Sequence, residues 1–168
     1  NPSEHPLSTV SAPAGSNLTG YMDGYLVQSQ AESIAPLMAD KSVNSWVMHC
    51  AGITSMARAD APNSADTQFF LMRQEQAQLD QNYTPWGRVV AGLETVRSIK
   101  AGPPETDGRL APDQADRLMR AVIVDDLPMQ DQPVVYIQRT EGEAFKASLP
   151  GPEAMLLYQK DFYEAWDV

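Results

Sequence analysis

Residues 52–92 read GITSMARADAPNSADTQFFLMRQEQAQLDQNYTPWGRVVAG, and this segment decides how the whole chain is interpreted. It contains short β-prone runs at Ile53 to Ala57, Gln68 to Met72 and Gly87 to Ala91. Proline, asparagine, aspartate and glycine residues separate these runs, which is the pattern of strands joined by turns and loops. We therefore predict that the three runs are neighbouring strands of a mainly β fold.

The chain after this segment is predicted to form a helix, two further strands and a second helix. Leu93 to Lys100 has apolar residues at helical spacing, and Gly102-Pro103 is a typical stop signal for a helix. Leu118 to Val124 and Val134 to Gln138 are rich in β-branched residues, which favour strands. From residue 152 onward, apolar residues recur on one face of an expected C-terminal helix, namely Met155, Tyr158 or Gln159, Phe162 and Trp166.

The chain before residue 52 is expected to be mostly irregular at first. Residues 1–20 combine prolines and glycines with serine, threonine and asparagine, so we expect a long arm or loop there. Ala31 to Asp40 fits one or two helical turns, and Ser45 to Cys50 fits a strand. We divide the chain into a proline-rich arm and long loop at 1–45, a domain at 46–126 and a C-terminal extension at 127–168.

The composition narrows the classes of function. The chain has 168 residues, of which 43% are hydrophobic, and this is enough for one folded domain with a core. Its formal net charge of −10 argues against nucleic acid as a partner, because phosphate-rich surfaces attract basic patches. No apolar stretch approaches the ~20 residues of a transmembrane helix, so the chain is not expected to span a membrane.

The cysteine and histidine content bears on metals and on nucleophilic catalysis. The chain has one cysteine, Cys50, and two histidines, His5 and His49, so we expect no metal site and no cofactor. We interpret Cys50 as a small half-buried thiol on a strand. The sequence contains no Ser-His-Asp or Cys-His pattern that predicts a nucleophile.

The motifs within residues 52–92 resemble the second half of a cyclophilin, the family of peptidyl-prolyl cis-trans isomerases. The matching elements, in order, are Ser55-Met56-Ala57-Arg58-Ala59, the loop from Pro62 to Thr67, Gln68-Phe69-Phe70, Leu79-Asp80 with Tyr83, and Gly87 to Gly92. The resemblance implies a closed antiparallel β-barrel, incomplete in this chain, with one or two flanking helices and a C-terminal helix. The C-terminal extension resembles that of some bacterial members.

The resemblance also implies an activity, the rotation of the bond that precedes proline. This rotation has a barrier of ~18–20 kcal/mol for a peptide bond and breaks no covalent bond, so it needs a pocket that favours the twisted amide. By position, Phe70 and Leu79 correspond to residues that hold the proline ring, and Tyr83 stands where many members carry histidine. We expect Gln68 to make a defined hydrogen bond, because a buried glutamine without a partner would cost about 1–3 kcal/mol.

A strand edge beside this pocket is expected to bind the substrate backbone. Ala57, Arg58 and Ala59 match the edge along which the family lays a bound peptide, where small side chains permit close approach. The predicted catalytic residues are therefore Gln68 and Phe70, and the predicted substrate-binding residues are Ala57, Arg58, Ala59, Leu79 and Tyr83. The expected partner is a proline-containing polypeptide, and the expected role is in protein folding, as an isomerase or chaperone.

The arginine that donates to the proline amide in cyclophilins has no counterpart here, because residues 1–57 contain no arginine. In one explanation, an upstream segment or another subunit supplies the arginine and completes the barrel, which we favour because an incomplete barrel exposes unpaired edges. In the other, the chain is a non-catalytic cyclophilin-like interaction module in a larger assembly. From the extended bacterial members we expect periplasmic or other export, with the cytoplasm as the alternative.

Overall fold

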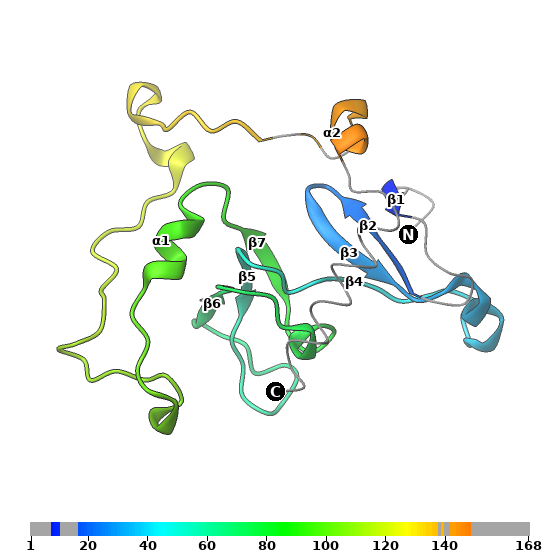
Figure 1. Cartoon of the computed structure of the whole chain (residues 1–168), viewed down its shortest axis with the longest axis horizontal. Coiled ribbons are helices and arrows are strands. Elements are labelled where there is room, and N and C mark those ends of the chain that lie inside the picture. Colours follow the sequence, from blue (N-terminus) through cyan, green and yellow to red (C-terminus); the bar gives the residue numbers. More distant parts are fainter. Residues whose placement is uncertain (1–7, 11–16, 138, 140–141, 149–168) are drawn as a thin grey trace.

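The computed structural model describes residues 8–10, 17–137, 139 and 142–148, and their strands form two antiparallel sheets (Figure 1). The first sheet has the order β1-β2-β3-β4, and the second has the order β6-β5-β7. The strands are β1 (Ser8–Val10), β2 (Leu18–Met22), β3 (Tyr25–Ser29), β4 (Ser45–Val47), β5 (Ile53–Met56), β6 (Phe69–Leu71) and β7 (Pro85–Arg88).

Short helices connect and follow the strands. The α-helices are α1 (Leu93–Ser98) and α2 (Glu143–Ser148), and the 3-10 helices are η1 (Glu32–Leu37), η2 (Ala77–Leu79), η3 (Pro104–Thr106), η4 (Val124–Asp126) and η5 (Met129–Asp131). The structure confirms the helical turns expected after residue 31, the strand expected from Ser45 and the helix expected from Leu93. The fold is mainly β with few helices.

A tight hairpin in the first sheet corrects the expectation of an irregular N-terminal arm. Asp23 and Gly24 form its turn, with φ angles of 50° and 82°, and Met22 pairs with Tyr25 directly beside them. Two successive residues with positive φ are typical of a type I′ turn, whose twist matches that of the flanking strands. Strand β1 and the first three residues of β2 thus lie within residues 1–20, although the division of the chain into domains stays a prediction.

Gly24 also permits a contact between the two sheets. A β-carbon at this position would lie 2.5 Å from Nη2 of Arg88, which belongs to β7. The guanidinium carbon of Arg88 lies 5.9 Å from the ring centroid of Tyr25 in β3, a cation–π arrangement. Because Gly24 has no side chain, the Arg88 side chain can extend from the second sheet to the hairpin turn of the first.

The second sheet confirms the three neighbouring strands expected from the sequence. Its central strand β5 is buried at Ile53, Thr54 and Ser55, because it has a partner strand on each side. The pairing with β7 shifts register between Thr54 and Ser55, opposite Pro85. Proline lacks a backbone N–H and is tolerated in an edge strand or at such a bulge, so its place at the start of β7 is consistent.

The two strands predicted after α1 are wrong for this structure. Residues 118–123 and 134–137 form no helix or strand, and Val124 begins η4. In Figure 1 the chain after α1 runs as an open trace away from both sheets before it returns to α2 beside the first sheet. There the ring of Phe145 packs edge-on against Tyr21 of β2, with centroids 4.8 Å apart. The helix predicted from residue 152 lies outside the described residues.

The core of the described residues is small. Its buried hydrophobic side chains are Val27, Ala31, Ile53, Met72 and Val96. By contrast, ten large hydrophobic side chains between residues 118 and 137 are exposed. Much of the apolar surface of this segment is therefore accessible to solvent. The sheets are open, and the closed barrel stays a prediction. No helix among the described residues combines the length and the apolar character required to cross a membrane.

Candidate functional site

Three of the predicted site residues meet in one aromatic cluster. Phe70 of β6 packs edge-on against Tyr83, with ring centroids 5.6 Å apart and planes at 85°. The guanidinium carbon of Arg58 lies 5.0 Å from the centroid of the Tyr83 ring. All three side chains are half-buried, so the cluster is supported from one side and still reaches the surface. The structure thus brings together residues that lie up to 25 positions apart in the sequence.

Arg58 also holds two loops together through its hydrogen bonds. Its Nε donates to the carbonyl oxygen of Asn82 at 2.9 Å, and its Nη1 donates to the carbonyl oxygens of Ala59 and Asp60 at 2.9 and 3.0 Å. These bonds join the loop after β5 to the loop that carries Tyr83. Arg58 is thus held by side-chain contacts at both loops, and these contacts favour a positioning role.

Hydrogen bonds of backbone N–H groups fix the conformation of the segment predicted to bind a peptide. The N–H of Ala57 donates to the carbonyl of Gln68 at 2.9 Å, and the N–H of Met56 donates to the carbonyl of Thr84 at 3.0 Å. The N–H of Ala59 donates to Oγ of Ser64 at 2.9 Å. Ala57 is thus tied to Gln68 just before β6, and Ala59 is tied to Ser64 in the loop after β5.

Gln68 was expected to make a hydrogen bond because it was expected to be buried, and the structure shows that it is not buried. Its side chain is exposed, so the free-energy cost of burying an unpaired amide does not apply. Gln68 directly precedes β6, two positions before Phe70, and its carbonyl continues the pairing with β5 by accepting from the N–H of Ala57. Alternate residues of an extended strand face the same side. The exposed amide therefore extends from the same side as the Phe70 ring, and its role toward a substrate stays a prediction.

Leu79 positions Tyr83 through the backbone. It ends η2, and its carbonyl oxygen accepts hydrogen bonds from the N–H groups of Asn82 and Tyr83, each at 3.1 Å. The turn between them requires a left-handed residue, and Gln81 has a φ of 63° there. Leu79 is half-buried, and its backbone contacts place it beside the aromatic cluster.

Replacing Gln81 with glycine is expected to stabilise the protein by about 0.5–1 kcal/mol. A left-handed conformation costs a residue with a β-carbon about 1–2 kcal/mol, and the greater freedom of glycine in the unfolded chain offsets part of the gain. Urea unfolding of the two proteins measures the difference. The same replacement at the exposed Gln78, which has a negative-φ helical conformation in η2, should destabilise instead. A loss of stability in Gln81→Gly would contradict this reading of the turn.

A buried hydrogen-bonded chain beneath the cluster was missed in the sequence. His49 Nδ1 lies 2.8 Å from Oδ1 of Asp80, and His49 Nε2 lies 2.8 Å from Oγ of Ser55. The backbone N–H of His49 donates to the same Asp80 oxygen at 2.8 Å. Because the carboxylate accepts, Nδ1 carries a proton, and in the neutral ring Nε2 accepts from the Ser55 hydroxyl. The imidazole also stacks on Phe70, with centroids 6.1 Å apart.

This Ser55–His49–Asp80 chain corrects the statement that the sequence offers no such arrangement, but it does not provide a nucleophile. Ser55 is 0% exposed and His49 is 1% exposed, so no substrate carbonyl can reach Oγ of Ser55. These hydrogen bonds instead fix the position of the His49 ring, on which Phe70 stacks. Its signals in the sequence were the polar Ser55 within a buried strand and Asp80 within the matched Leu79-Asp80 pair.

Cys50 is not an activated thiol. Burial, with smaller contributions from the charges of Glu75 and Asp80, raises the pKa of Cys50 to about 12. Burial and the charge of Asp80 likewise raise the pKa of Glu75. The thiol is half-buried, as expected, but lies after β4 rather than within a strand. No cluster of three or more histidine, cysteine, aspartate or glutamate residues suited to a metal ion occurs in the described part of the chain.

Alkylation of Cys50 by iodoacetamide at pH 8 is expected to be at least about tenfold slower in the folded protein than in urea. The raised pKa leaves less reactive thiolate in the folded state, although the thiolate of a weaker acid is intrinsically more nucleophilic. The folded pKa lies above the unfolded one, so this group stabilises the fold below about pH 9, and that stability is lost as the pH rises toward 12. Equal rates in both states at pH 8 would contradict the burial of this thiol.

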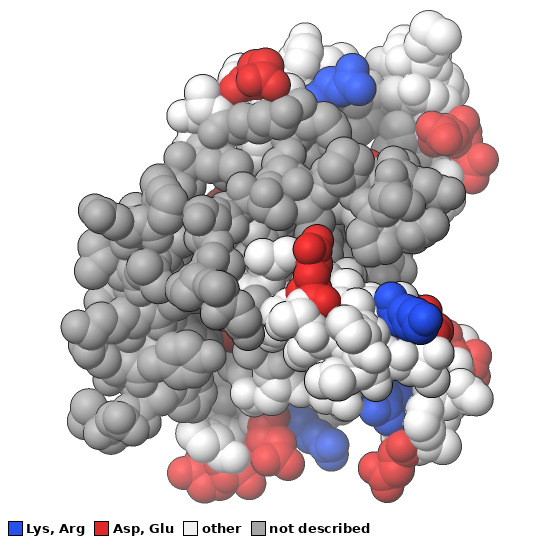
Figure 2. All heavy atoms as spheres, turned by 90° about the vertical axis from the view of Figure 1, so that its right-hand side faces the viewer, with Lys and Arg blue, Asp and Glu red and all other residues white. Residues whose placement is uncertain are grey.

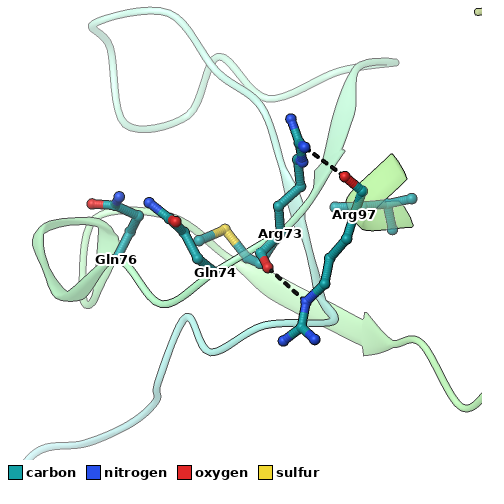
Figure 3. Close-up of a pocket in the computed structure, with 6 residues that line it drawn as sticks. Arg73, Gln74, Gln76 and Arg97 are labelled. Atoms are coloured by element: carbon teal, nitrogen blue, oxygen red, sulfur yellow. Dashed lines mark hydrogen bonds between the residues drawn. The ribbon is translucent and has the colours of Figure 1, made fainter. Parts of the chain in front are cut away.

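A hollow of about 690 Å³ lies away from the aromatic cluster, lined by Leu71, Met72, Arg73, Gln74, Gln76 and Arg97. Arg73 donates from Nη2 to the carbonyl oxygen of Arg97, and Arg97 donates from Nε to the carbonyl oxygen of Arg73. Figure 3 shows that the two guanidinium groups point in opposite directions and do not converge on one ligand position. The hydrogen bonds tie the end of β6 to α1, and the hollow is not the predicted proline site.

Charged side chains are mixed on the face seen in Figure 2. The lysine and arginine residues visible there are scattered among aspartate and glutamate residues and form no continuous basic patch on the described part of this face. Lys100 and Asp116 form an exposed ion pair, with Nζ and Oδ1 3.3 Å apart. Exposed pairs of this kind add little to stability.

Comparison with known proteins points to one family. A family model described as "Cyclophilin type peptidyl-prolyl cis-trans isomerase/CLD" matches residues 14–123. A probable peptidyl-prolyl cis-trans isomerase of Brucella abortus (strain 2308) is 39% identical over 75 residues, which are 45% of this chain and 37% of that protein. The Arabidopsis thaliana peptidyl-prolyl cis-trans isomerase CYP18-2 is 34% identical over 95 residues, 56% of each chain.

A solved structure shows the same similarity in three dimensions. The crystal structure of cyclophilin AquaCyp293 from Hirschia baltica matches with a TM-score of 0.64 and 36% sequence identity. The match covers 78% of this chain but 47% of that one. The chain therefore spans about half, or less than half, of the length of each of these relatives.

Proposed function

Because this chain belongs to the family of cyclophilin-type peptidyl-prolyl cis-trans isomerases, we propose that it acts on X-Pro bonds of polypeptides. The observation that carries the proposal is the contact of Phe70 with Tyr83 and of Tyr83 with Arg58, which follows the end of β5. Such a site fits a partly unfolded, proline-containing chain, in keeping with a role in protein folding.

The aromatic cluster would seat the proline ring. Phe70 offers an apolar ring face backed by the buried imidazole of His49, and Tyr83 stands against its edge. Leu79, which orients Tyr83 through its carbonyl, would close another side of the pocket. A pocket fixed from beneath in this way holds the ring still while the preceding carbonyl rotates, which is the motion that the reaction requires.

The polar groups around the cluster would bind the rest of the substrate. The carbonyl oxygens of Ala57 and Ala59 would accept main-chain hydrogen bonds from the peptide, since the N–H groups of both residues already donate within the chain. Main-chain bonds of this kind give affinity without strong sequence selection. The exposed amide of Gln68 would bond to the substrate backbone on the side of Phe70. Each of these bonds aids catalysis only as far as it is stronger for the twisted amide than for the planar one.

The donor to the proline nitrogen would come from outside residues 1–57, which contain no arginine. The nearest guanidinium among the described residues of the cluster is that of Arg58, and its Nε and Nη1 already donate to three carbonyl oxygens. We propose that the two sheets belong to a closed antiparallel barrel completed by further strands, and that the segment that completes it also supplies the arginine.

Nuclear magnetic resonance exchange spectroscopy on a peptide with one Ala-Pro bond tests the proposed activity. Catalytic amounts of the intact natural protein should produce exchange cross-peaks between the cis and trans forms, which interconvert over tens of seconds or more without a catalyst. Absence of catalysed exchange, combined with binding of the same peptide, would favour the alternative of a non-catalytic interaction module. Absence of both would contradict the proposal.

A further inference from the structure

Arg58 uses three of the five N–H donors of its guanidinium group inside the protein. Its Nε donates to the carbonyl oxygen of Asn82, and its Nη1 donates to the carbonyl oxygens of Ala59 and Asp60. A guanidinium group has one N–H on Nε and two on each Nη, so these bonds occupy every donor of the first two nitrogens. Among the described residues, no group accepts a hydrogen bond from Nη2. The two unused donors are therefore both on Nη2.

The charge of Arg58 also has no carboxylate partner in the part of the chain that the structure describes. The ion pairs found there join His49 to Asp80 and Lys100 to Asp116. The three groups that accept from Arg58 are uncharged carbonyl oxygens, so they position the guanidinium without neutralising it. Although the chain carries a net charge of −10, Arg58 thus remains a cation with which the carboxylate of a ligand can pair.

This cation lies beside the proposed position of the proline ring. The ring of Tyr83 packs against Phe70 and also lies 5.0 Å from the guanidinium carbon of Arg58. The ring contact and the three hydrogen bonds together fix the half-buried guanidinium plane. Consecutive residues of an extended chain advance by about 3.3–3.6 Å, so a peptide whose proline lies on Phe70 brings its neighbouring side chain close to the Tyr83 ring and to Arg58.

We propose that Nη2 of Arg58 selects polypeptides that carry a glutamate or aspartate directly before or after the proline. A carboxylate accepts charge-assisted hydrogen bonds from a guanidinium group, and these are stronger than hydrogen bonds between neutral groups. The internal contacts already hold the Arg58 side chain, so little further side-chain freedom is lost on binding. The inference rests on the proposed function, because it takes the aromatic cluster as the proline site, and it adds a preference among X-Pro substrates.

Three alanine-based peptides with one proline test this preference on the intact natural protein. The first has glutamate next to the proline, the second has glutamine there, and the third has the glutamate at its far end. The first and third peptides carry the same net charge, so they separate a local contact from the general repulsion by an acidic protein. At about 0.15 M salt the first peptide should bind about three- to fivefold more tightly than the other two, a modest factor because the site is half-exposed.

A pair of arginine variants locates the preference. Arg58→Gln should bring the affinities for the first two peptides within about 1.5-fold of each other, because it removes the charge and the two free donors of Nη2. The matched control is Arg88→Gln, which removes the same charge and the same kind of contact with a tyrosine ring, that of Tyr25 at 5.9 Å. The control should keep the full preference. A preference that survives Arg58→Gln, or that both variants lose equally, would overturn the proposal.

The peptide comparison needs no variant, so it decides the matter even if Arg58→Gln fails to fold. Equal affinity for the three peptides, with the glutamate before the proline and also with it after, would overturn the proposal. If the protein then still accelerated the cis-trans exchange of an Ala-Pro peptide, the proposed function would stand without this preference. Tighter binding of the first peptide without any catalysed exchange would support the preference and contradict the isomerase activity alone.

Discussion

Replacement of Phe70 with alanine is expected to lower the isomerase kcat/KM of the intact protein about tenfold or more while leaving it folded. The Phe70 ring is half-buried, rests on His49 and contacts Tyr83, so its removal takes away the apolar surface proposed to seat the proline ring. Loss of this contact with a pyrrolidine ring corresponds to about 1.4 kcal/mol or more of transition-state stabilisation. The measurement is the rate of cis-trans exchange of an Ala-Pro peptide.

The neighbouring Phe69 provides a matched control. It is the preceding residue of the same strand, faces the other side of the sheet, is 51% exposed and packs against Trp86 at 5.8 Å. Phe69→Ala removes the same atoms and should change kcat/KM less than about twofold, an effect far below the tenfold that corresponds to 1.4 kcal/mol. If Phe69→Ala impaired turnover as much as Phe70→Ala, the aromatic cluster would not be the proline site.

Replacement of His49 with alanine is expected to lower the free energy of unfolding by about 3 kcal/mol or more. The imidazole is 1% exposed, so its loss leaves a cavity. It also leaves Oγ of Ser55 without its partner and Oδ1 of Asp80 with the backbone N–H of residue 49 alone. Removing one member of a buried charge-assisted pair is among the more destabilising single changes. Urea unfolding with a two-state fit measures the change.

Further variants separate the free-energy cost of losing the hydrogen bonds from the cost of the cavity. Ser55→Ala removes one hydrogen bond and little volume, so it should cost about 1–2 kcal/mol. A double-mutant cycle between His49→Ala and Asp80→Asn should give a coupling energy of about 1 kcal/mol or more, because the two side chains are in direct contact. Additive effects of the two changes would contradict the hydrogen bond that the structure shows between them.

The short strands of the second sheet were predictable because their residues favour strands and because the strands with which they pair are close in the sequence. Ile53, Thr54 and Ser55 are β-prone or small, and the sequence supplies strand partners within 35 positions. The aromatic cluster followed from the resemblance, since Phe70 and Tyr83 belong to the matched motifs. Its geometry needed the structure, because the contact of Arg58 with Tyr83 depends on loop conformations that no periodicity encodes.

Other features were within reach of the sequence and were missed. Asp23-Gly24 between Tyr21 and Tyr25 is a strong local signal for a two-residue hairpin, and the prolines before it directed the interpretation toward a loop instead. The partnership of His49 with Asp80 spans 31 positions, and a sequence alone does not reveal which buried histidine meets which carboxylate. Gln68 was expected to be buried because it opens an apolar run, yet it lies just before the edge strand β6 and is exposed.

The segment from Leu118 to Val124 failed as a strand prediction for a different reason. Its residues favour a strand, but a strand needs a neighbour, and the described residues provide none. The expected compartment and the division into domains stay predictions, because they depend on properties that neither side-chain contacts nor family membership determines.

The most direct test of the account asks where a proline ring binds. Nuclear Overhauser effects between the ring protons of a bound Ala-Pro peptide and the side chains of the protein should appear at Phe70, Leu79 and Tyr83. A matched Ala-Ala peptide should bind more weakly and give no such contacts. Contacts of the proline ring with Phe69 and Trp86, or with the side chains around Arg73 and Arg97, would contradict the account.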